Sequence, residues 1–220
     1  MTHVFDIDPE LSATMAGVCG PFCDGEGLRQ AEAAGWSPEL WSTLTELGLT
    51  GVGVGEESGG SGGSAAEAAE LVRVAGYLAA PVPLAERSLI AGPMLAGAGV
   101  ALPAGPIAVT AEASEVTLRS TGSSWSISGS MRSVAAGRMA SYVVTDIVQN
   151  DTRVTILAPV VPQSVTPGTN YAGEPRDAII FDDVPVQVLA DRADGSFMAH
   201  GALARALQMA GALERVLDMT

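Results

Sequence analysis

The residue pattern changes twice along this 220-residue chain. Up to about residue 104, apolar residues recur at helical spacing between glycines and prolines. From 105 to 195, short runs rich in Val, Ile and Thr alternate with turn-forming residues, which is typical of an antiparallel sheet. From residue 196 the helical spacing returns and continues to Thr220. We therefore expect an α+β chain with a helical domain at 1–104, an antiparallel barrel or sandwich at 105–195 and one long helix at 196–220.

The first domain contains two well-marked helix starts. Ser37-Pro38-Glu39 places a Ser cap, a Pro and a carboxylate in one first turn, so a helix is expected from there to Gly48. Ser64 caps an Ala-rich helix over about 65–78, after a glycine-dense loop at 55–63. Between these helices we expect a short extended segment over 49–54. Further helices are expected over 12–18, 28–34 and 85–95, the last interrupted or kinked at Gly92-Pro93.

The middle domain is expected to hold short strands, separated by turns such as Thr121-Gly122-Ser123 and Pro167-Gly168. The expected strands are 107–110, 116–119, 125–128, 141–146, 154–159, 178–181 and 186–189.

Charge and composition exclude several classes of function. The net charge is −14, which repels nucleic acid and anionic membrane surfaces. The eleven basic residues are all Arg, so neither a Schiff base nor a lysine general base is available from this chain. Hydrophobic residues make up 47% of the chain but aromatic residues only 5%, so the core must consist mainly of Ala, Val and Leu.

Metal binding, export and membrane insertion are not expected. Cys19 and Cys23 supply two thiols, whereas the histidines His3 and His200 lie at opposite ends of the chain. A zinc site needs four convergent ligands, so we interpret the cysteines as small apolar residues near a helix end. The first residues are acidic and lack an apolar segment, and the weakly polar stretch 88–109 is broken by prolines. We expect a cytoplasmic protein.

Three segments, in order, resemble the acyl-CoA dehydrogenase family. Residues 40–62, LWSTLTELGLTGVGVGEESGGSG, are similar to its helix, apolar run and Gly-Gly loop. Residues 75–95 contain the Pro-Val-Pro-Leu link common in actinobacterial members. Residues 178–189, AIIFDDVPVQVL, resemble its last barrel strand. The resemblance implies a helical domain, a β-barrel and a carboxy-terminal bundle, of which only the first helix is present.

The same resemblance implies a cofactor and a substrate. In that family FAD lies between the barrel and the bundle, and a carboxylate removes the α-proton of an acyl-CoA thioester while a hydride passes to the flavin. Carried over to this chain, the flavin-binding positions are Val109, Thr110, Ser133 and Ala135. Thr110 keeps the hydroxyl expected to bond the flavin ring.

Other positions depart from the family pattern. Ser133 stands where an aromatic residue covers the flavin, Ala135 where a hydroxyl residue touches it, and Met131 where the family has lysine. The turn expected to meet the pyrophosphate lacks its Pro and Gly-Ser-Asp, and it carries Glu112 and Glu115 instead. FAD binding by this chain alone is therefore in doubt, and a plain hairpin connection at this turn is the alternative.

The catalytic base is not identified. The early bundle position that some members use falls near Gly201 and Ala202, and neither is acidic. His200 is adjacent and titrates near neutrality in general, but it also fits an exposed helix-start residue. Glu214 lies too far along the helix to match.

We therefore expect an acyl-CoA dehydrogenase-like subunit that acts on an acyl-CoA with FAD. It would form a homo- or hetero-oligomer with another acyl-CoA dehydrogenase-like chain, which would contribute the base and most of the flavin contacts. Two alternatives stay open: a non-catalytic scaffold or regulatory member that has lost FAD binding, and a homodimeric dehydrogenase with diverged flavin contacts.

Overall fold

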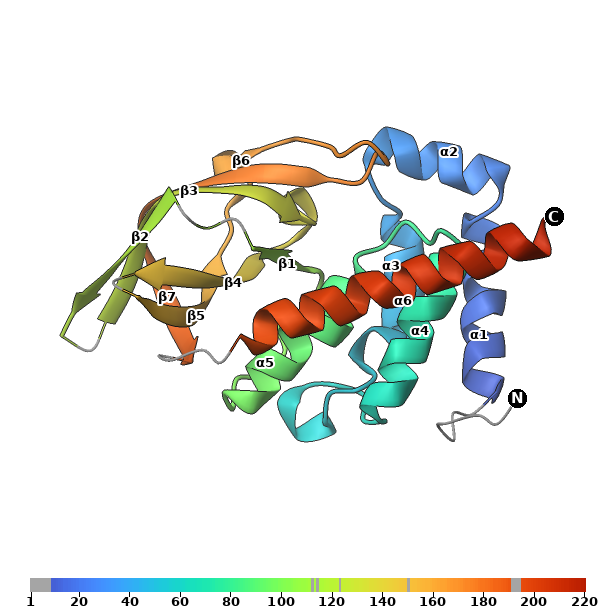
Figure 1. The fold of residues 1–220 in the computed structure, drawn as a ribbon, viewed down its shortest axis with the longest axis horizontal. Helices are drawn as coiled ribbons and strands as arrows, with labels where there is room; N and C mark the ends of the chain where they lie inside the picture. The colour runs from blue at the N-terminus through green and yellow to red at the C-terminus, as the bar shows by residue number, and fades with distance from the viewer. Residues whose placement is uncertain (1–8, 112, 114, 123, 150, 191–194) are drawn as a thin grey trace. The chain divides into compact units, whose positions relative to one another are not determined.

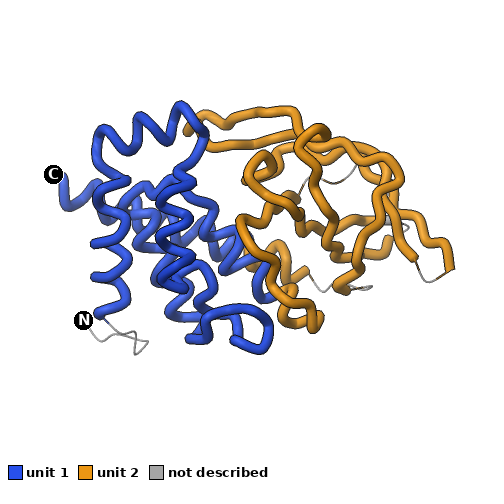
Figure 2. Tube along the Cα trace, turned by 180° about the vertical axis from the view of Figure 1, so that it is seen from behind, with its two compact units in different colours: residues 1–93, 201–220 blue, residues 94–200 orange. Residues whose placement is uncertain are grey.

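The computed structural model describes residues 9–111, 113, 115–122, 124–149, 151–190 and 195–220 (Figure 1). The chain divides into two compact units, one formed by residues 1–93 with 201–220 and the other by residues 94–200 (Figure 2). A helical region, a sheet and a final helix follow one another as the sequence predicts. Among the described residues, no helix combines the length and apolar character that crossing a bilayer requires.

The α-helices are α1 (Pro9–Cys19), α2 (Gly25–Ala34), α3 (Pro38–Glu46), α4 (Ala65–Tyr77), α5 (Gly92–Gly97) and α6 (Ser196–Asp218). Both predicted caps are present. The Ser37 hydroxyl accepts from the Leu40 amide at 3.2 Å. Ser64 forms a capping box with Glu67, in which each side chain accepts from the other residue's backbone N–H. The charged and polar residues at these helix starts therefore set where α3 and α4 begin.

One local expectation in this region was wrong. Residues Leu49–Gly51 form a 3-10 turn instead of an extended segment, because Gly48 takes a left-handed conformation at the end of α3 (φ 75°) and turns the chain. The helix expected over 85–95 changes type at Gly92, where a π-helical stretch, Glu86–Ala91, ends and α5 begins.

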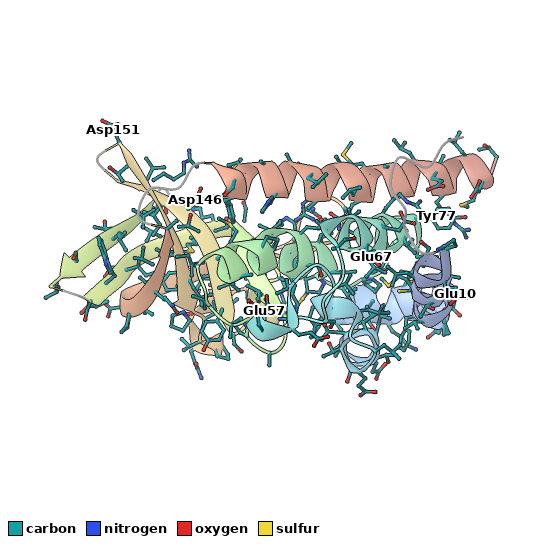
Figure 3. All side chains as sticks on the ribbon, turned by 90° about the horizontal axis from the view of Figure 1, so that it is seen from below. Glu10, Glu57, Glu67, Tyr77, Asp146 and Asp151 are labelled. Carbon is teal, nitrogen blue, oxygen red and sulfur yellow. The ribbon has the colours of Figure 1, made fainter. Side chains whose placement is uncertain are left out.

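Helices α4 and α6 approach each other closely within the first unit (Figure 1). A methyl group at Gly211 would overlap the Arg73 carbonyl, and one at Gly76 would overlap the Gln208 carbonyl. Around this crossing Arg73 forms an ion pair with Glu214. At the end of α4, the Tyr77 hydroxyl donates to Asp218 at 2.8 Å (Figure 3). Glycine on both helices therefore fixes which side of α6 is buried.

The second unit is built on one sheet. Its strands are β1 (Ile107–Thr110), β2 (Glu115–Thr121), β3 (Ser124–Ala135), β4 (Tyr142–Gln149), β5 (Thr152–Pro159), β6 (Val165–Thr166) and β7 (Arg176–Ala190). The two strands expected at 178–181 and 186–189 are a single long strand, β7, which bends at irregular pairings with β3.

The strand order is β2-β3-β1-β4-β5-β7-β6, and β3 also pairs with β7. The pairings β3–β1–β4–β5–β7 thus return to β3, and the sheet closes on itself around a core that includes Ile127, Met131, Ile147, Ile156 and Ile179. The sheet is mixed and not purely antiparallel as expected, because β1 pairs with β4 in parallel.

Candidate functional site

The four positions predicted to contact a flavin lie on adjoining strands of the second unit. Val109 and Thr110 end β1, and Ala135 ends β3 directly opposite Val109. Ser133 lies two residues before Ala135 on β3. The closed sheet therefore brings all four positions together at one end of the β1–β3 pair.

Thr110 is held by hydrogen bonds on both sides. Its hydroxyl donates to the Arg132 carbonyl at 2.8 Å. Its own carbonyl accepts from the Thr145 hydroxyl at 2.6 Å, from the parallel strand β4. Thr110 is only 4% exposed. A hydroxyl has a single hydrogen, so in this arrangement Thr110 is able to meet a flavin ring only as an acceptor.

Ser133 is exposed and Ala135 is buried, and neither offers a ring to stack on a flavin. Ser133 takes a positive φ of 50°, at the point where the β3–β7 pairing shifts register. This backbone conformation is uncommon for a residue other than glycine and turns the side chain out of the ladder. The fully buried Met131 belongs to the core of the sheet, so the position where the family has lysine faces inward.

Glu115, at the start of β2 after this turn, contacts a neighbouring cation. The Glu115 carboxylate accepts from the Ser130 hydroxyl at 2.6 Å and from Nε of Arg132 at 3.2 Å. The Ser130 hydrogen bond, followed by Arg132, lowers the pKa of Glu115. Glu112 lies outside the described residues. The charge of Glu115 is thus partly balanced within the hairpin, while Arg132 is engaged by that carboxylate.

Two buried polar groups in the sheet were not anticipated. On β4, the Asp146 carboxylate accepts from the Thr155 hydroxyl at 2.7 Å and pairs with Arg153 at 3.2 Å (Figure 3). An acidic residue between apolar strand residues is the signal that sequence reasoning passed over. The fully buried Asp177 pairs with Arg138 at 2.6 Å and accepts from the Gly168 amide at 3.0 Å. Both groups are saturated by their own neighbours, so we assign them to strand and hairpin anchoring.

A small hollow of ≈ 140 Å³ lies beside Arg138. Its lining is Gly137, Arg138, Ala140, Val160, Pro162, Val165 and Pro167. The hollow is too small for a flavin or an acyl chain, since ligand pockets are typically about 300–1,000 Å³.

The candidates for a catalytic base do not form a site in the described residues. Gly201 and Ala202 lie on α6 without acidic side chains, and Glu214 forms an ion pair with Arg73. Nδ1 of His200 is buried and has no hydrogen-bond partner among the residues that the structure describes. The base therefore remains unidentified in this chain.

The cysteines and the buried Arg87 are also accounted for locally. Cys19 ends α1 and its thiol donates to Sδ of Met15 at 3.8 Å. The hydrogen bond with Cys23 and burial raise the pKa of Cys19, which keeps it a thiol.

Burial lowers the pKa of Arg87 to about 10, and its Nε donates to the Thr50 carbonyl at 3.2 Å. The described residues hold no cluster of three or more His, Cys, Asp or Glu that suits a metal ion.

FAD fits this arrangement poorly. The one retained hydroxyl donates inward, none of the four expected positions carries an aromatic ring, and the sequence after β1 includes Glu112 and Glu115. The four expected positions therefore give such a ligand few side-chain contacts.

Residues 22–101 match the model of the acyl-CoA dehydrogenase N-terminal domain. No curated protein sequence matches the chain. The structure is similar to that of the ChsE4-ChsE5 complex from Mycobacterium tuberculosis, with a TM-score of 0.82 and 18% identity over 100% of this chain and 67% of that one.

Two further structures have the same fold. A variant of the Tcur3481-Tcur3483 steroid ACAD gives a TM-score of 0.72 at 21% identity, covering 92% of this chain and 61% of that one. Glutaryl-CoA dehydrogenase from Mycobacterium smegmatis gives 0.71 at 16% identity, covering 94% and 62%. The chain thus spans 61–67% of the length of these three proteins.

Proposed function

We propose that this chain, whose residues 22–101 belong to the acyl-CoA dehydrogenase N-terminal domain family and whose fold is that of these enzymes, is one subunit of a two-chain acyl-CoA dehydrogenase. The reaction is α,β-dehydrogenation of an acyl-CoA thioester, or of another CoA-linked side chain. FAD bound in the assembly would supply the electron acceptor for this oxidation.

The proposal rests on one observation: the chain keeps the fold but lacks part of the expected flavin site. The sheet keeps the strands that would border a flavin. However, the Thr110 hydroxyl donates to the Arg132 carbonyl, and the Ser133–Ala135 segment provides no aromatic ring. A chain of this kind needs another subunit for most cofactor contacts and for the base. No step through FAD is therefore assigned to residues of this chain.

Similar structures support the two-chain assembly. The ChsE4-ChsE5 complex and the Tcur3481-Tcur3483 ACAD are each named for two components. In the assembly we propose, this chain contributes the β1–β3 edge, and the partner contributes a carboxylate base. Glu214 is unsuited to that role because Arg73 neutralises it.

A non-catalytic member of the family is the second candidate. The inward hydrogen bond of the Thr110 hydroxyl also favours this candidate, because a chain that never binds flavin needs no hydroxyl that donates toward a ligand. In that case the chain keeps the fold as a scaffold and binds neither FAD nor an acyl-CoA.

Co-purification with the products of neighbouring genes distinguishes these candidates. The two-chain proposal expects a complex that shows the absorption bands of oxidised flavin, and that loses them when a saturated acyl-CoA is added without air. A complex that stays colourless with added FAD would support the scaffold. A chain that is yellow when purified alone would contradict the two-chain proposal.

A further inference from the structure

The two cysteines of the chain lie at the two ends of one short turn between α1 and α2 (Figure 1). Cys19 is the last residue of α1, the 3-10 turn Gly20–Phe22 follows, and Cys23 ends that turn. The next residue, Asp24, is already the N-cap of α2. The separation of the two cysteines is therefore set by a single turn of backbone.

The backbone of this turn keeps a helical course. Cys19 has φ −73° and ψ −29°, and the Cys23 amide donates to the Gly20 carbonyl at 3.2 Å. Residues four apart on a helix lie on the same side of it, with about 5–6 Å between their Cβ atoms. The Cys19 and Cys23 side chains therefore project from the same side of the turn.

Neighbouring residues hold this turn in place. The ring of Pro21 restricts its φ. Helix α2 begins so close behind the turn that a methyl group at Gly27 would overlap the Phe22 carbonyl. On the other side, the Cys19 thiol lies 3.8 Å from Sδ of the fully buried Met15. The packing therefore keeps the ends of the turn, with their two thiols, together.

The two thiols differ in exposure and in acidity. Cys19 is fully buried, whereas Cys23 is partly exposed. The hydrogen bond with Cys19 lowers the pKa of Cys23, against burial and the Asp24 carboxylate, which raise it. The same hydrogen bond and burial raise the pKa of Cys19. Cys23 is therefore the thiol that ionises first and that an oxidant in solution reaches first.

We propose that Cys19 and Cys23 are a redox pair, which a peroxide oxidises to a disulfide within the chain. The Cys23 thiolate attacks one oxygen of hydrogen peroxide and the O–O bond breaks. Hydroxide leaves and is protonated to water, and Cys23 becomes a sulfenic acid. The Cys19 sulfur then attacks the Cys23 sulfur, the S–O bond breaks, and the departing hydroxide takes the Cys19 proton to form water. Together the thiols lose two electrons and two protons, and one peroxide becomes two waters.

The spacing within the turn makes this disulfide a reversible one. A disulfide needs about 3.5–4.5 Å between its Cβ atoms, which is less than the about 5–6 Å between positions four apart on a helix. The turn must therefore tighten when the bond forms, and it relaxes when the bond is reduced. A strained disulfide with one partly exposed sulfur is of the labile kind, whereas structural disulfides of exported proteins resist reduction by glutathione.

Treatment of the purified chain with a small excess of hydrogen peroxide tests the proposal. Arg29 is the first basic residue that trypsin cleaves after, so one tryptic peptide contains both cysteines. We expect this peptide to lose the mass of two hydrogens, and a chromogenic thiol reagent to find two thiols in the unfolded chain before treatment and none after it. Reduced glutathione should restore both thiols.

Four results would overturn the redox pair. They are thiols that stay reduced, a peptide that gains oxygen atoms without losing hydrogens, a link between the peptides of two chains, and a disulfide that glutathione leaves intact. These measurements need neither flavin nor an acyl-CoA. The redox pair therefore stands or fails independently of the proposed enzyme function.

Single substitutions test the order of the two steps. In Cys19→Ala, Cys23 should be oxidised to a sulfenic acid that dimedone traps, because the second thiol is missing. In Cys23→Ser, the matched control, the buried Cys19 should stay reduced under the same conditions. Circular dichroism checks that both variants are folded. If Cys19 in Cys23→Ser is oxidised as fast as Cys23 in Cys19→Ala, Cys23 is not the thiol that reacts first, and the proposed sequence of steps is wrong.

Discussion

Thr110, one of the four expected flavin positions, is engaged within the sheet. Its side chain is almost fully buried and its hydroxyl donates to the Arg132 carbonyl at 2.8 Å. The hydroxyl therefore links β1 to β3 in the absence of a ligand. This hydrogen bond stabilises the sheet whether or not a cofactor binds.

Thr110→Val should lower the free energy of unfolding by about 1–3 kcal/mol, because it keeps the shape but leaves the Arg132 carbonyl without this donor in a part-buried hydrogen bond. Urea denaturation checks this, with Thr110→Ser as the control that keeps the hydroxyl. In the two-chain complex the flavin content should change little. Unchanged stability together with lost flavin would mean that the hydroxyl points toward the cofactor.

Glu70 gives the helical unit an acid-sensitive contact. Its carboxylate accepts from two nitrogens of Arg73, at 2.8 and 2.7 Å, and from the Ser12 hydroxyl at 2.7 Å. The hydrogen bonds from Arg73 lower the pKa of Glu70 below its ordinary value of 4.5. The stability that this contact contributes is therefore present above pH 4.5. It is lost as the pH falls through the lowered pKa of Glu70 in the folded chain.

We expect Glu70→Gln to reduce the free energy of unfolding by about 1–3 kcal/mol at pH 7. As the pH falls through the lowered folded-state pKa of Glu70, the difference from the unchanged chain should shrink, since both side chains are then neutral. Denaturant titrations over a pH series measure this. A difference that is constant with pH would show that the charge of Glu70 is not what matters.

Glycine allows α6 to lie close to α4. Gly211→Ala adds a methyl group where the Arg73 carbonyl lies, so we expect a loss of about 1–3 kcal/mol from overpacking. Gly201→Ala on the same helix meets no atom within 4 Å and should stabilise by about 0.5–1 kcal/mol. Thermal unfolding of both variants tests the close approach of the two helices. Equal changes in stability for Gly211→Ala and Gly201→Ala would contradict it.

Local chemistry explains which elements the sequence predicted well. The starts of α3 and α4 follow from Ser37 and Ser64, whose hydroxyls satisfy the first amides of each helix. The short strands follow from β-branched runs between turns. The closed sheet was expected from the family resemblance, and the order of its strands was not predicted, because strand pairing is not local.

What the sequence did not predict depends on contacts between distant residues. A glycine within a helix does not reveal its partner, so the Gly76–Gly211 crossing had no signal. The expected strands at 178–181 and 186–189 join in β7 because its irregular pairing with β3 allows a bend without a break. The inward hydrogen bond of Thr110 needed the position of Arg132. The four expected flavin positions remain a prediction.

Taken as a whole, the chain combines the acyl-CoA dehydrogenase fold with four expected flavin positions that carry no aromatic ring. Its net charge of −14 offers no general attraction for the phosphates of FAD or CoA. Both features favour an assembly in which a second chain holds most of the cofactor.

Equilibrium dialysis of the purified chain against FAD tests this account most directly. We predict no binding above background at FAD concentrations up to about 100 µM, a level at which even a micromolar site would be nearly full. We also predict stoichiometric FAD once the partner chain is present. Stoichiometric binding by the chain alone, weakened by Thr110→Val and not by Thr110→Ser, would contradict the account.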